Sequence, residues 1–213
     1  MKYKSYWRKS GLKAHWGKVY LNHLKKYKPK NFLEIGVFCG VTARNTCDYL
    51  SKEHNNEFSY IGVDFFGEEN LDKSSTDEIK PSFLKKHRFS NPLKNIYYNF
   101  IKRENINSLE SVTKFLKKYE QNVKLVQGDT NTVLKNLDLS KIDYAFVDGG
   151  HSYNTVLNDL NLLYQKLGSN KVLLCDDYGG EHIPEVQKAI NEFVKSKNLK
   201  INLIENRFAE IIT

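Results

Sequence analysis

Residues 31–42 read NFLEIGVFCGVT, an apolar run that ends in a glycine turn and leads into a helical pattern at 41–53. Similar short runs rich in Val, Ile and Phe recur along the chain, and longer amphipathic stretches separate them. Because the runs are nearly continuous rather than alternating, they predict strands covered on both faces of a sheet. The expected strands are 31–37, 58–64, 123–128, 142–147, 171–175, 200–205 and 207–212.

The stretches between these runs have the apolar spacing of helices, so strands and helices alternate along the chain. Such alternation predicts right-handed crossovers and an α/β fold with a doubly wound, largely parallel sheet. Only Asn206 separates the last two runs, which therefore predict an antiparallel hairpin at one edge of the sheet. The expected helices are 13–28, 41–53, 108–120, 130–136, 153–167 and 183–197.

Length and composition are those of a globular protein, and we expect one domain over residues 1–213. No apolar run approaches the roughly 20 residues that span a bilayer. The basic start of the chain is not followed by the apolar segment of a secretory signal. The three cysteines have neither metal-ligand nor redox-motif spacing, so we expect reduced thiols in a cytoplasmic protein. They are Cys39, Cys47 and Cys175.

The net charge of +8 belongs to the N-terminal part of the chain. Residues 1–33 contain ten Lys or Arg and no acid, whereas the remainder contains 23 Lys or Arg and 25 Asp or Glu. A basic arm and helix over 1–30, with aromatic residues between the charges, is compatible with an anionic partner such as RNA. No nucleic-acid motif accompanies the charge, so we favour a solvated tail and helix face.

Residues 65–107 interrupt the alternation between the second and third expected strands. The stretch is polar and contains Pro81 and Pro92. Insertions of this length inside compact domains are commonly functional, so we predict a lid over 65–107.

Carboxylates or glycine turns follow the first five expected strands. In open α/β sheets, ligands bind outside the carboxyl ends of the strands, where such side chains gather. One aspartate there is also explained as a helix cap, but the whole set indicates a ligand crevice. The segments are 34–42 (EIGVFCGVT), 62–64 (GVD), 128–130 (GDT), 147–151 (VDGGH) and 175–180 (CDDYGG).

The first turn indicates which ligand binds. A dinucleotide fingerprint starting at Gly36 requires glycine where Phe38 and Val41 stand, which argues against a nicotinamide-linked oxidoreductase. The glycine turn still allows a ligand to approach the backbone. Asp64 can accept two ribose hydroxyls, and Asp129 or the amides beside it can meet an adenine amino group. The pattern suits an adenosine that carries no pyrophosphate.

Taken together, these motifs resemble those of class I S-adenosylmethionine (SAM)-dependent methyltransferases. Within that superfamily they resemble the macrocin O-methyltransferase-like group, which is metal-dependent and modifies sugar hydroxyls of macrolides. The resemblance covers about residues 30–212 and implies a Rossmann-like seven-stranded sheet of order 3-2-1-4-5-7-6 with strand 7 antiparallel. The matching motifs are Glu34-x-Gly36-x-x-x-Gly40-x-Thr42, Asp64, Gly128-Asp129, Asp148-Gly149-x-His151-x-Tyr153 and Asp176-Asp177-Tyr178-Gly179.

The resemblance implies SAM as the cofactor and assigns residues to its parts. Asp64 would hold the ribose, and Asp129 with Thr130 would lie beside the adenine. Thr42 is either a SAM contact or the first turn of a helix, or both. The residues that would shape the methionine end of the pocket are Glu34, Gly36 and Gly40.

The same resemblance assigns Asp148, Asp176 and Asp177 as ligands of Mg²⁺ or another divalent cation. Three carboxylates at the ends of neighbouring strands repel one another unless a cation lies between them, and oxygen ligands suit Mg²⁺. Asp148 would also border the cofactor. Asp148 or His151 would accept the proton that an attacking hydroxyl loses.

These inferences predict a SAM-dependent, Mg²⁺-dependent O-methyltransferase that acts on a hydroxyl of a small polyhydroxylated, sugar-like acceptor. One alternative is an RNA methyltransferase that uses the basic arm. VDGGH stands where base-methylating enzymes carry an asparagine–proline motif, which argues against that alternative. A second alternative is a non-catalytic SAM-binding protein, for which the aspartate cluster would have no use. We expect no nucleic-acid or membrane partner, and a homodimer stays open.

Overall fold

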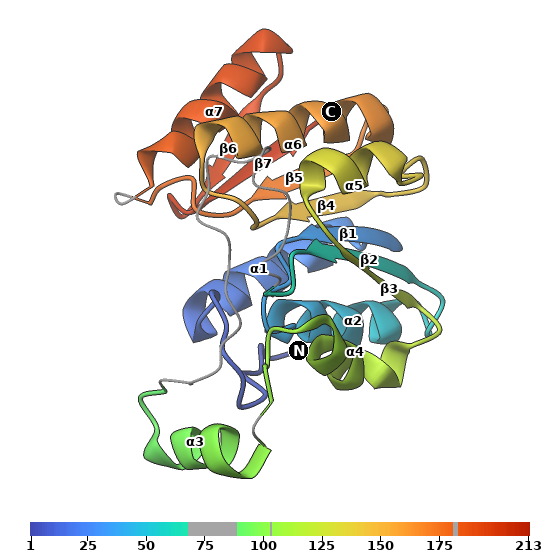
Figure 1. The fold of residues 1–213 in the computed structure, drawn as a ribbon. Coiled ribbons are helices and arrows are strands. Elements are labelled where there is room, and N and C mark those ends of the chain that lie inside the picture. The colour runs from blue at the N-terminus through green and yellow to red at the C-terminus, as the bar shows by residue number, and fades with distance from the viewer. Residues whose placement is uncertain (68–88, 103, 181–182) are drawn as a thin grey trace.

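The computed structural model describes residues 1–67, 89–102, 104–180 and 183–213. Seven strands form one sheet in the order β3-β2-β1-β4-β5-β7-β6 (Figure 1). β7 runs antiparallel to both β5 and β6, and the other neighbours are parallel. The predicted fold class and strand order are therefore confirmed. The strands are β1 Asn31–Ile35, β2 Ser59–Asp64, β3 Val123–Gln127, β4 Tyr144–Val147, β5 Val172–Cys175, β6 Ile201–Ile204 and β7 Phe208–Ile212.

Helices lie between the strands close to their predicted positions. The pattern at 108–120 divides into α4 and a short 3₁₀ turn, η2. Within the described ranges, no helix combines the length and the apolar character that a membrane crossing needs. The helices are α1 Ala14–Tyr27, α2 Val41–Glu53, α3 Pro92–Ile96, the π-helix η1 Tyr97–Lys102, α4 Leu109–Leu116, η2 Lys117–Tyr119, α5 Thr130–Asn136, α6 Tyr153–Leu167 and α7 Pro184–Ser196.

The sheet has helices on both faces. α1, α2 and α4 cover one face, and α5, α6 and α7 cover the other (Figure 1). The first face is aromatic: Phe32 stacks between Tyr60 and Tyr144, with ring centroids 5.8 and 5.2 Å apart. The second face is mainly aliphatic. Because side chains alternate along β1, Glu34 points with Phe32 into the aromatic layer. This orientation matters for the site described below.

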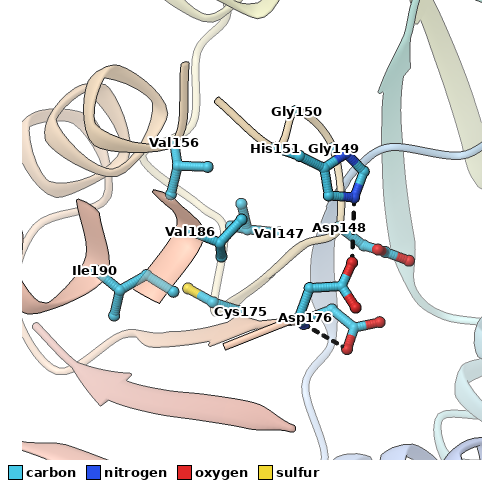
Figure 2. Close-up of a pocket in the computed structure, with 11 residues that line it drawn as sticks. Val147, Asp148, Gly149, Gly150, His151, Val156, Cys175, Asp176, Val186 and Ile190 are labelled. Atoms are coloured by element: carbon cyan, nitrogen blue, oxygen red, sulfur yellow. Dashed lines mark hydrogen bonds and ion pairs between the residues drawn. The ribbon is translucent and has the colours of Figure 1, made fainter. Parts of the chain in front are cut away.

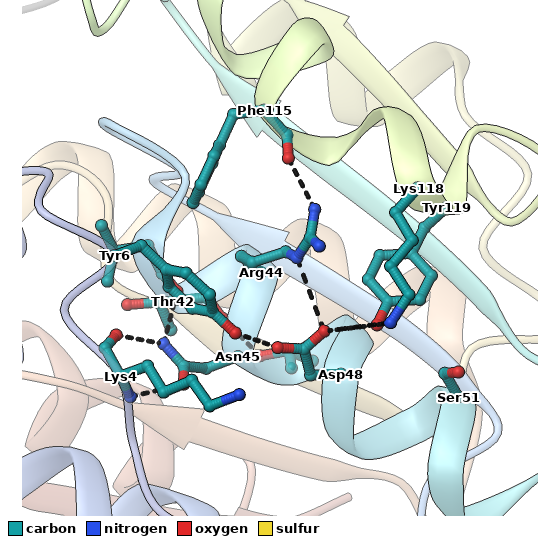
Figure 3. Close-up of polar contacts among 12 residues, drawn as sticks. Lys4, Tyr6, Thr42, Arg44, Asn45, Asp48, Ser51, Phe115, Lys118 and Tyr119 are labelled. Carbon is teal, nitrogen blue, oxygen red and sulfur yellow. Dashed lines mark hydrogen bonds and ion pairs between the residues drawn. The ribbon is translucent and has the colours of Figure 1, made fainter.

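The N-terminal arm, residues 1–13, packs against the body instead of extending into solvent. Tyr3, Arg8 and Leu12 are buried. The Lys4 N–H donates to Asn45 Oδ1 (2.8 Å), and Asn45 Nδ2 returns a bond to the Lys4 carbonyl (2.8 Å) (Figure 3). The expectation of a solvated tail is therefore wrong for Tyr3, Arg8 and Leu12, which anchor the arm, although Lys2, Lys4, Trp7 and Lys13 are exposed as expected.

Arg8 ties the arm to two other parts of the chain. Its Nε donates to the Cys39 carbonyl at 2.8 Å, in the loop that follows β1. Its Nη2 donates to Ser111 Oγ at 3.0 Å and to the Ile106 carbonyl. The arm, the loop after β1 and the segment that follows the insertion are thus joined by one buried guanidinium.

The predicted lid at 65–107 lies in part outside the described residues. Its described portion includes α3 and η1, which Figure 1 shows standing away from the sheet. Their exposed apolar side chains are Leu93, Ile96, Phe100 and Ile101. The function of this segment as a lid stays a prediction.

A buried polar network fastens α1 to the edge of the sheet. Glu210 on β7 lies 2.5 Å from His23 Nε2 and 3.0 Å from Lys26 Nζ. Burial alone would raise the pKa of Glu210, but hydrogen bonds from Lys26, Tyr27, His23 and Asn202 outweigh it and hold that pKa at about 2. Glu210 therefore stabilises the fold at neutral pH.

We expect Glu210→Gln to lower the free energy of unfolding at pH 7 by about 3 kcal/mol, since it leaves a broken buried pair. The group's ordinary pKa is 4.5, so its stabilisation is complete above that pH and is lost as the pH falls toward 2. Denaturant unfolding at neutral and acidic pH measures both effects. Glu205→Gln removes a comparable but exposed pair with His15 and should change stability by less than about 0.5 kcal/mol. Equal effects from the two variants would contradict this account.

Candidate active site

A cavity of about 760 Å³ opens at the carboxyl ends of the parallel strands. Its walls come from the loops after β1 to β5, from Arg207 just before β7 and from the N-terminal arm. Its volume falls within the range of small-molecule and cofactor sites. Polar and glycine residues among its lining are Ser10, Gly11, Gly36, Asp64, Asn107, Gly128, Asp129, Thr130, Asp148, Gly149, Gly150, His151, Thr155, Asp177 and Arg207.

The loop after β1 approaches the end of β4 so closely that only glycine fits at Gly36. Its φ is +89°, and a β-carbon there would lie 1.9 Å from the main-chain oxygen of Asp148. Phe38, also in the left-handed region at φ +51°, lines the cavity two residues later. The loop thus presents backbone to the cavity and places the carboxyl end of β1 against Asp148.

Asp64, at the end of β2, fixes the same loop. Its Oδ2 accepts the Phe38 N–H at 2.7 Å, and its Oδ1 accepts the Phe66 N–H at 2.6 Å. Burial raises the pKa of Asp64, and these N–H bonds oppose the rise. Each carboxylate oxygen retains a lone pair, so the side chain can still accept hydroxyls from a ligand in the cavity.

Asp129 and Thr130 lie at the start of α5, on the wall formed after β3. The Asp129 side chain caps α5 by accepting the Asn131 N–H at 2.9 Å, and both residues line the cavity. Gly36, Asp64, Asp129, Thr130 and Asp148 therefore line one cavity, and their roles in binding SAM stay predictions.

Three other residues assigned to the cofactor lie outside this lining. Glu34 is fully buried in the aromatic layer, where Tyr60 donates to it at 2.7 Å, and burial raises its pKa to about 8. Gly40 caps α2 and packs on Val112. Thr42 is buried, with its hydroxyl 3.0 Å from that of Tyr3. These three residues lie behind the loop and not on the cavity wall, and their part in SAM binding stays a prediction.

At one end of the cavity, three carboxylates converge from the ends of β4 and β5. Asp148, Asp176 and Asp177 each offer an oxygen within 4.8 Å of the others. Figure 2 shows a small neighbouring pocket, in which Asp148, Asp176 and His151 lie together on one side, opposite Val186 and Ile190. Asp148, His151 and Asp177 line both this pocket and the large cavity. Asp177 has φ +59°, so the chain turns there and neighbouring aspartates can face the same point.

Asp176 and Asp177 already have partners. Arg207 binds Asp176 through two nearly parallel bonds, Nε to Oδ1 at 2.6 Å and Nη2 to Oδ2 at 2.7 Å. His151 Nε2 lies 3.1 Å from Asp177 Oδ2, and this bond lowers the pKa of Asp177. Burial, followed by the charges of Asp176 and Asp177, raises the pKa of Asp148 well above its usual range.

The donor set fits a divalent cation. When all three carboxylates are ionised, the single guanidinium leaves two of their negative charges unbalanced. All the donors are hard oxygens, which suit Mg²⁺ or a similar ion. The charges that raise the pKa of Asp148 are those that a bound cation would neutralise. Asp148 and Asp177 are placed to hold such an ion, and Asp176 is shared with Arg207.

The sequence did not indicate the contributions of the arm or of Arg207. Ser10 and Gly11 line the cavity only because the preceding residues dock on α2, and no local motif signals that docking. The position of Arg207 could have been inferred from the expected topology of the sheet. An antiparallel β7 beside β5 starts where β5 ends, so its first residues must lie next to Asp176 and Asp177.

The fold is shared with solved methyltransferases. The O-methyltransferase NovP superposes with a TM-score of 0.65 at 15% identity, over 91% of this chain and 79% of that one. CalS11, described as a calicheamicin methyltransferase, gives a TM-score of 0.62 at 16% identity, over 94% and 80%. The SAH-bound methyltransferase PaMTH1 of Podospora anserina gives 0.58 at 15%, over 95% and 79%. Identities this low show the fold alone.

Sequence comparison provides two matches. An uncharacterized protein of Acanthamoeba polyphaga mimivirus is 39% identical over 54 residues, which are 25% of this chain and only 24% of that relative. The family model described as a methyltransferase domain matches residues 33–178, which is more than half of the chain and spans β1 to the turn after β5. This protein therefore belongs to the methyltransferase-domain family.

Proposed function

We propose that this protein is a SAM-dependent O-methyltransferase that requires Mg²⁺ or another divalent cation and modifies a hydroxyl of a small polyhydroxylated acceptor. One observation carries the proposal. The aspartate cluster with two unbalanced negative charges borders the same cavity as Asp64 and the glycine turn. A nucleoside site and a cation site thus share one space, as transfer to a metal-bound hydroxyl requires.

The cofactor half of the cavity is proposed to bind SAM through the loops after β1 to β3. Asp64 is held rigid by two backbone N–H groups, so its remaining lone pairs have a fixed direction toward ribose hydroxyls. Gly36 allows the methionine part to approach main chain, and Asp129 with Thr130 flanks the adenine.

The acceptor half is proposed to lie over Asp148 and Asp177. A divalent cation bound there would lower the pKa of an acceptor hydroxyl. Asp148 borders both halves, and its raised pKa brings its basicity closer to that of a general base working at neutral pH. His151 contacts Asp177 and lies in the same lining, so it orients that carboxylate and offers a second proton acceptor.

The acceptor class draws support from the neighbours. CalS11 is described as a TDP-rhamnose 3′-O-methyltransferase, and the other solved neighbours named above are methyltransferases. The RNA alternative gains no support from Tyr3 and Arg8, which are buried against the body of the protein. A cytoplasmic location and a homodimer stay predictions.

Calorimetry with S-adenosylhomocysteine tests the cofactor site. We expect binding to the wild-type protein and a loss of about 100-fold in affinity for Asp64→Ala, since charged hydrogen bonds contribute about 1.5–3 kcal/mol each. Asp138→Ala is the matched control, because Asp138 also accepts the N–H two residues ahead but is exposed and far from the cavity lining. Undiminished binding of S-adenosylhomocysteine by Asp64→Ala would refute the assignment of Asp64, at the end of β2, to the ribose. Screening of sugar and catechol acceptors, with and without EDTA, tests the reaction itself.

A further inference from the structure

Arg207 is the cation that this fold places in the aspartate cluster. It precedes β7, and its guanidinium makes both of its short bonds to Asp176, whose side chain is only 1% exposed. The same Nη2 lies 3.7 Å from Asp177 Oδ1. A planar guanidinium that meets a carboxylate with two parallel bonds is among the strongest pairings available to a protein.

The backbone around Arg207 is fixed to the turn that carries the aspartates. The Tyr178 N–H donates to the Arg207 carbonyl at 2.9 Å. A β-carbon on Gly179 would lie 1.5 Å from the Asn206 carbonyl oxygen, so the two turns touch main chain to main chain. The guanidinium also lies 5.3 Å from the ring centre of Trp16 on α1. Arg207 therefore reaches Asp176 from a rigid support.

This placement creates a conflict with the proposed cation. Arg207 neutralises one of three carboxylates and occupies both oxygens of Asp176, while a divalent ion would draw on the same cluster. Two cations this close repel strongly at the low effective dielectric of a half-buried site. The presence of one must weaken the binding of the other.

We propose that Arg207 is a built-in counter-ion that competes with the divalent cation for Asp176 and thereby sets the metal affinity of the site. The inference rests on the proposed function, because it assumes the metal site described above. In the metal-free protein, Arg207 keeps buried Asp176 paired. When a cation binds Asp148 and Asp177, the bond between Arg207 and Asp176 weakens.

Competition differs from a simple structural salt bridge in a measurable way. A structural pair, once broken, destabilises the protein by the same amount with or without metal. A competing pair, once broken, leaves a buried carboxylate that the metal itself can neutralise. Loss of Arg207 should therefore destabilise the metal-free protein and strengthen its response to metal.

The test measures Mn²⁺ binding by calorimetry and electron paramagnetic resonance at fixed pH and salt. We expect Arg207→Gln to bind Mn²⁺ at least tenfold more tightly than the wild type. Arg207→Lys keeps the positive charge but cannot form the two parallel bonds. Its Mn²⁺ affinity should lie between those of the wild type and Arg207→Gln. Lys171→Gln removes a positive charge at the opposite end of the sheet, where Lys171 pairs with Asp143, and should leave the affinity unchanged.

Thermal unfolding provides the second readout. Metal-free Arg207→Gln should melt below the wild type, and saturating Mn²⁺ should raise its melting temperature more than it raises that of the wild type. Equal or weaker Mn²⁺ affinity in Arg207→Gln, with binding intact in the wild type, would overturn the competition and leave the proposed function standing. An absence of binding in every variant would overturn both, while binding of S-adenosylhomocysteine tests the cofactor site separately.

Discussion

Gly36→Ala should abolish detectable binding of S-adenosylhomocysteine and destabilise the protein by about 3 kcal/mol or more. The added methyl group would stand 1.9 Å from the main-chain oxygen of Asp148 and 2.8 Å from the Gly149 α-carbon. Both obstacles are backbone, so no side-chain rotation relieves the overlap. The loop after β1 would have to leave the end of β4, which breaks the bond that the Phe38 N–H donates to Asp64 and opens the proposed nucleoside site. Calorimetry and thermal unfolding measure the two effects.

Gly11→Ala is the matched control for this substitution. Gly11 also lines the cavity, but a β-carbon there meets no atom within 4 Å. We expect its melting temperature to match that of the wild type. If Gly36→Ala binds the ligand as the wild type does, the close contact between the β1 loop and β4 is not a feature of the protein in solution.

Asp148→Asn should reduce methyl transfer by about 1000-fold or more, since it removes the proposed base and a cation ligand in one step. Affinity for S-adenosylhomocysteine should change only a few-fold, because the amide preserves the shape of the wall. Mn²⁺ binding should weaken by about 100-fold. Formation of S-adenosylhomocysteine with an acceptor from the screen measures turnover.

The same variant should be more heat-stable than the wild type by about 2–4 °C. Burial and the charges of Asp176 and Asp177 raise the pKa of Asp148, so keeping a carboxylate at this position opposes folding at neutral pH. Asp143→Asn, at the opposite end of the same strand region, is the control and should leave metal binding and turnover unchanged. Reduced stability of Asp148→Asn together with normal turnover would mark Asp148 as a structural residue.

The sheet was predictable because its signals are local. Each parallel strand appears as a continuous apolar run, and the hairpin of β6 and β7 follows from two runs with a minimal turn between them. The positive φ values of Glu205 and Asn206 are those of a tight turn, which short polar residues tolerate. The crossover rule predicts the hand of the parallel connections, whereas the strand order 3-2-1-4-5-7-6 was implied by the resemblance to class I methyltransferases.

The candidate site was predictable only where one topological rule applied. Carboxyl ends of parallel strands meet at one edge, so Asp64, Asp148 and the 176–177 pair had to converge. Glu34 was expected near the methionine end of the cofactor, but its position in β1 directs its side chain into the aromatic layer. The motif alone does not indicate which face of the sheet this side chain occupies. The docking of the arm depends on contacts between segments far apart in the chain, which a single sequence does not record. The position of Arg207 could have been inferred from the antiparallel pairing of β7 with β5.

The N-terminal arm, residues 1–13, contributes Ser10 and Gly11 to the cavity lining. They share a wall with the nucleoside site, and Arg8 bonds the carbonyl of Cys39 in the glycine loop. Order in the N-terminal arm and occupancy of the cavity are therefore thermodynamically linked. A ligand that binds more tightly when the arm is docked should also reduce the motion of the arm, because coupling free energies are reciprocal. A partner that displaced the arm from the body of the protein would lower the affinity for the cofactor without contacting the loops at the strand ends.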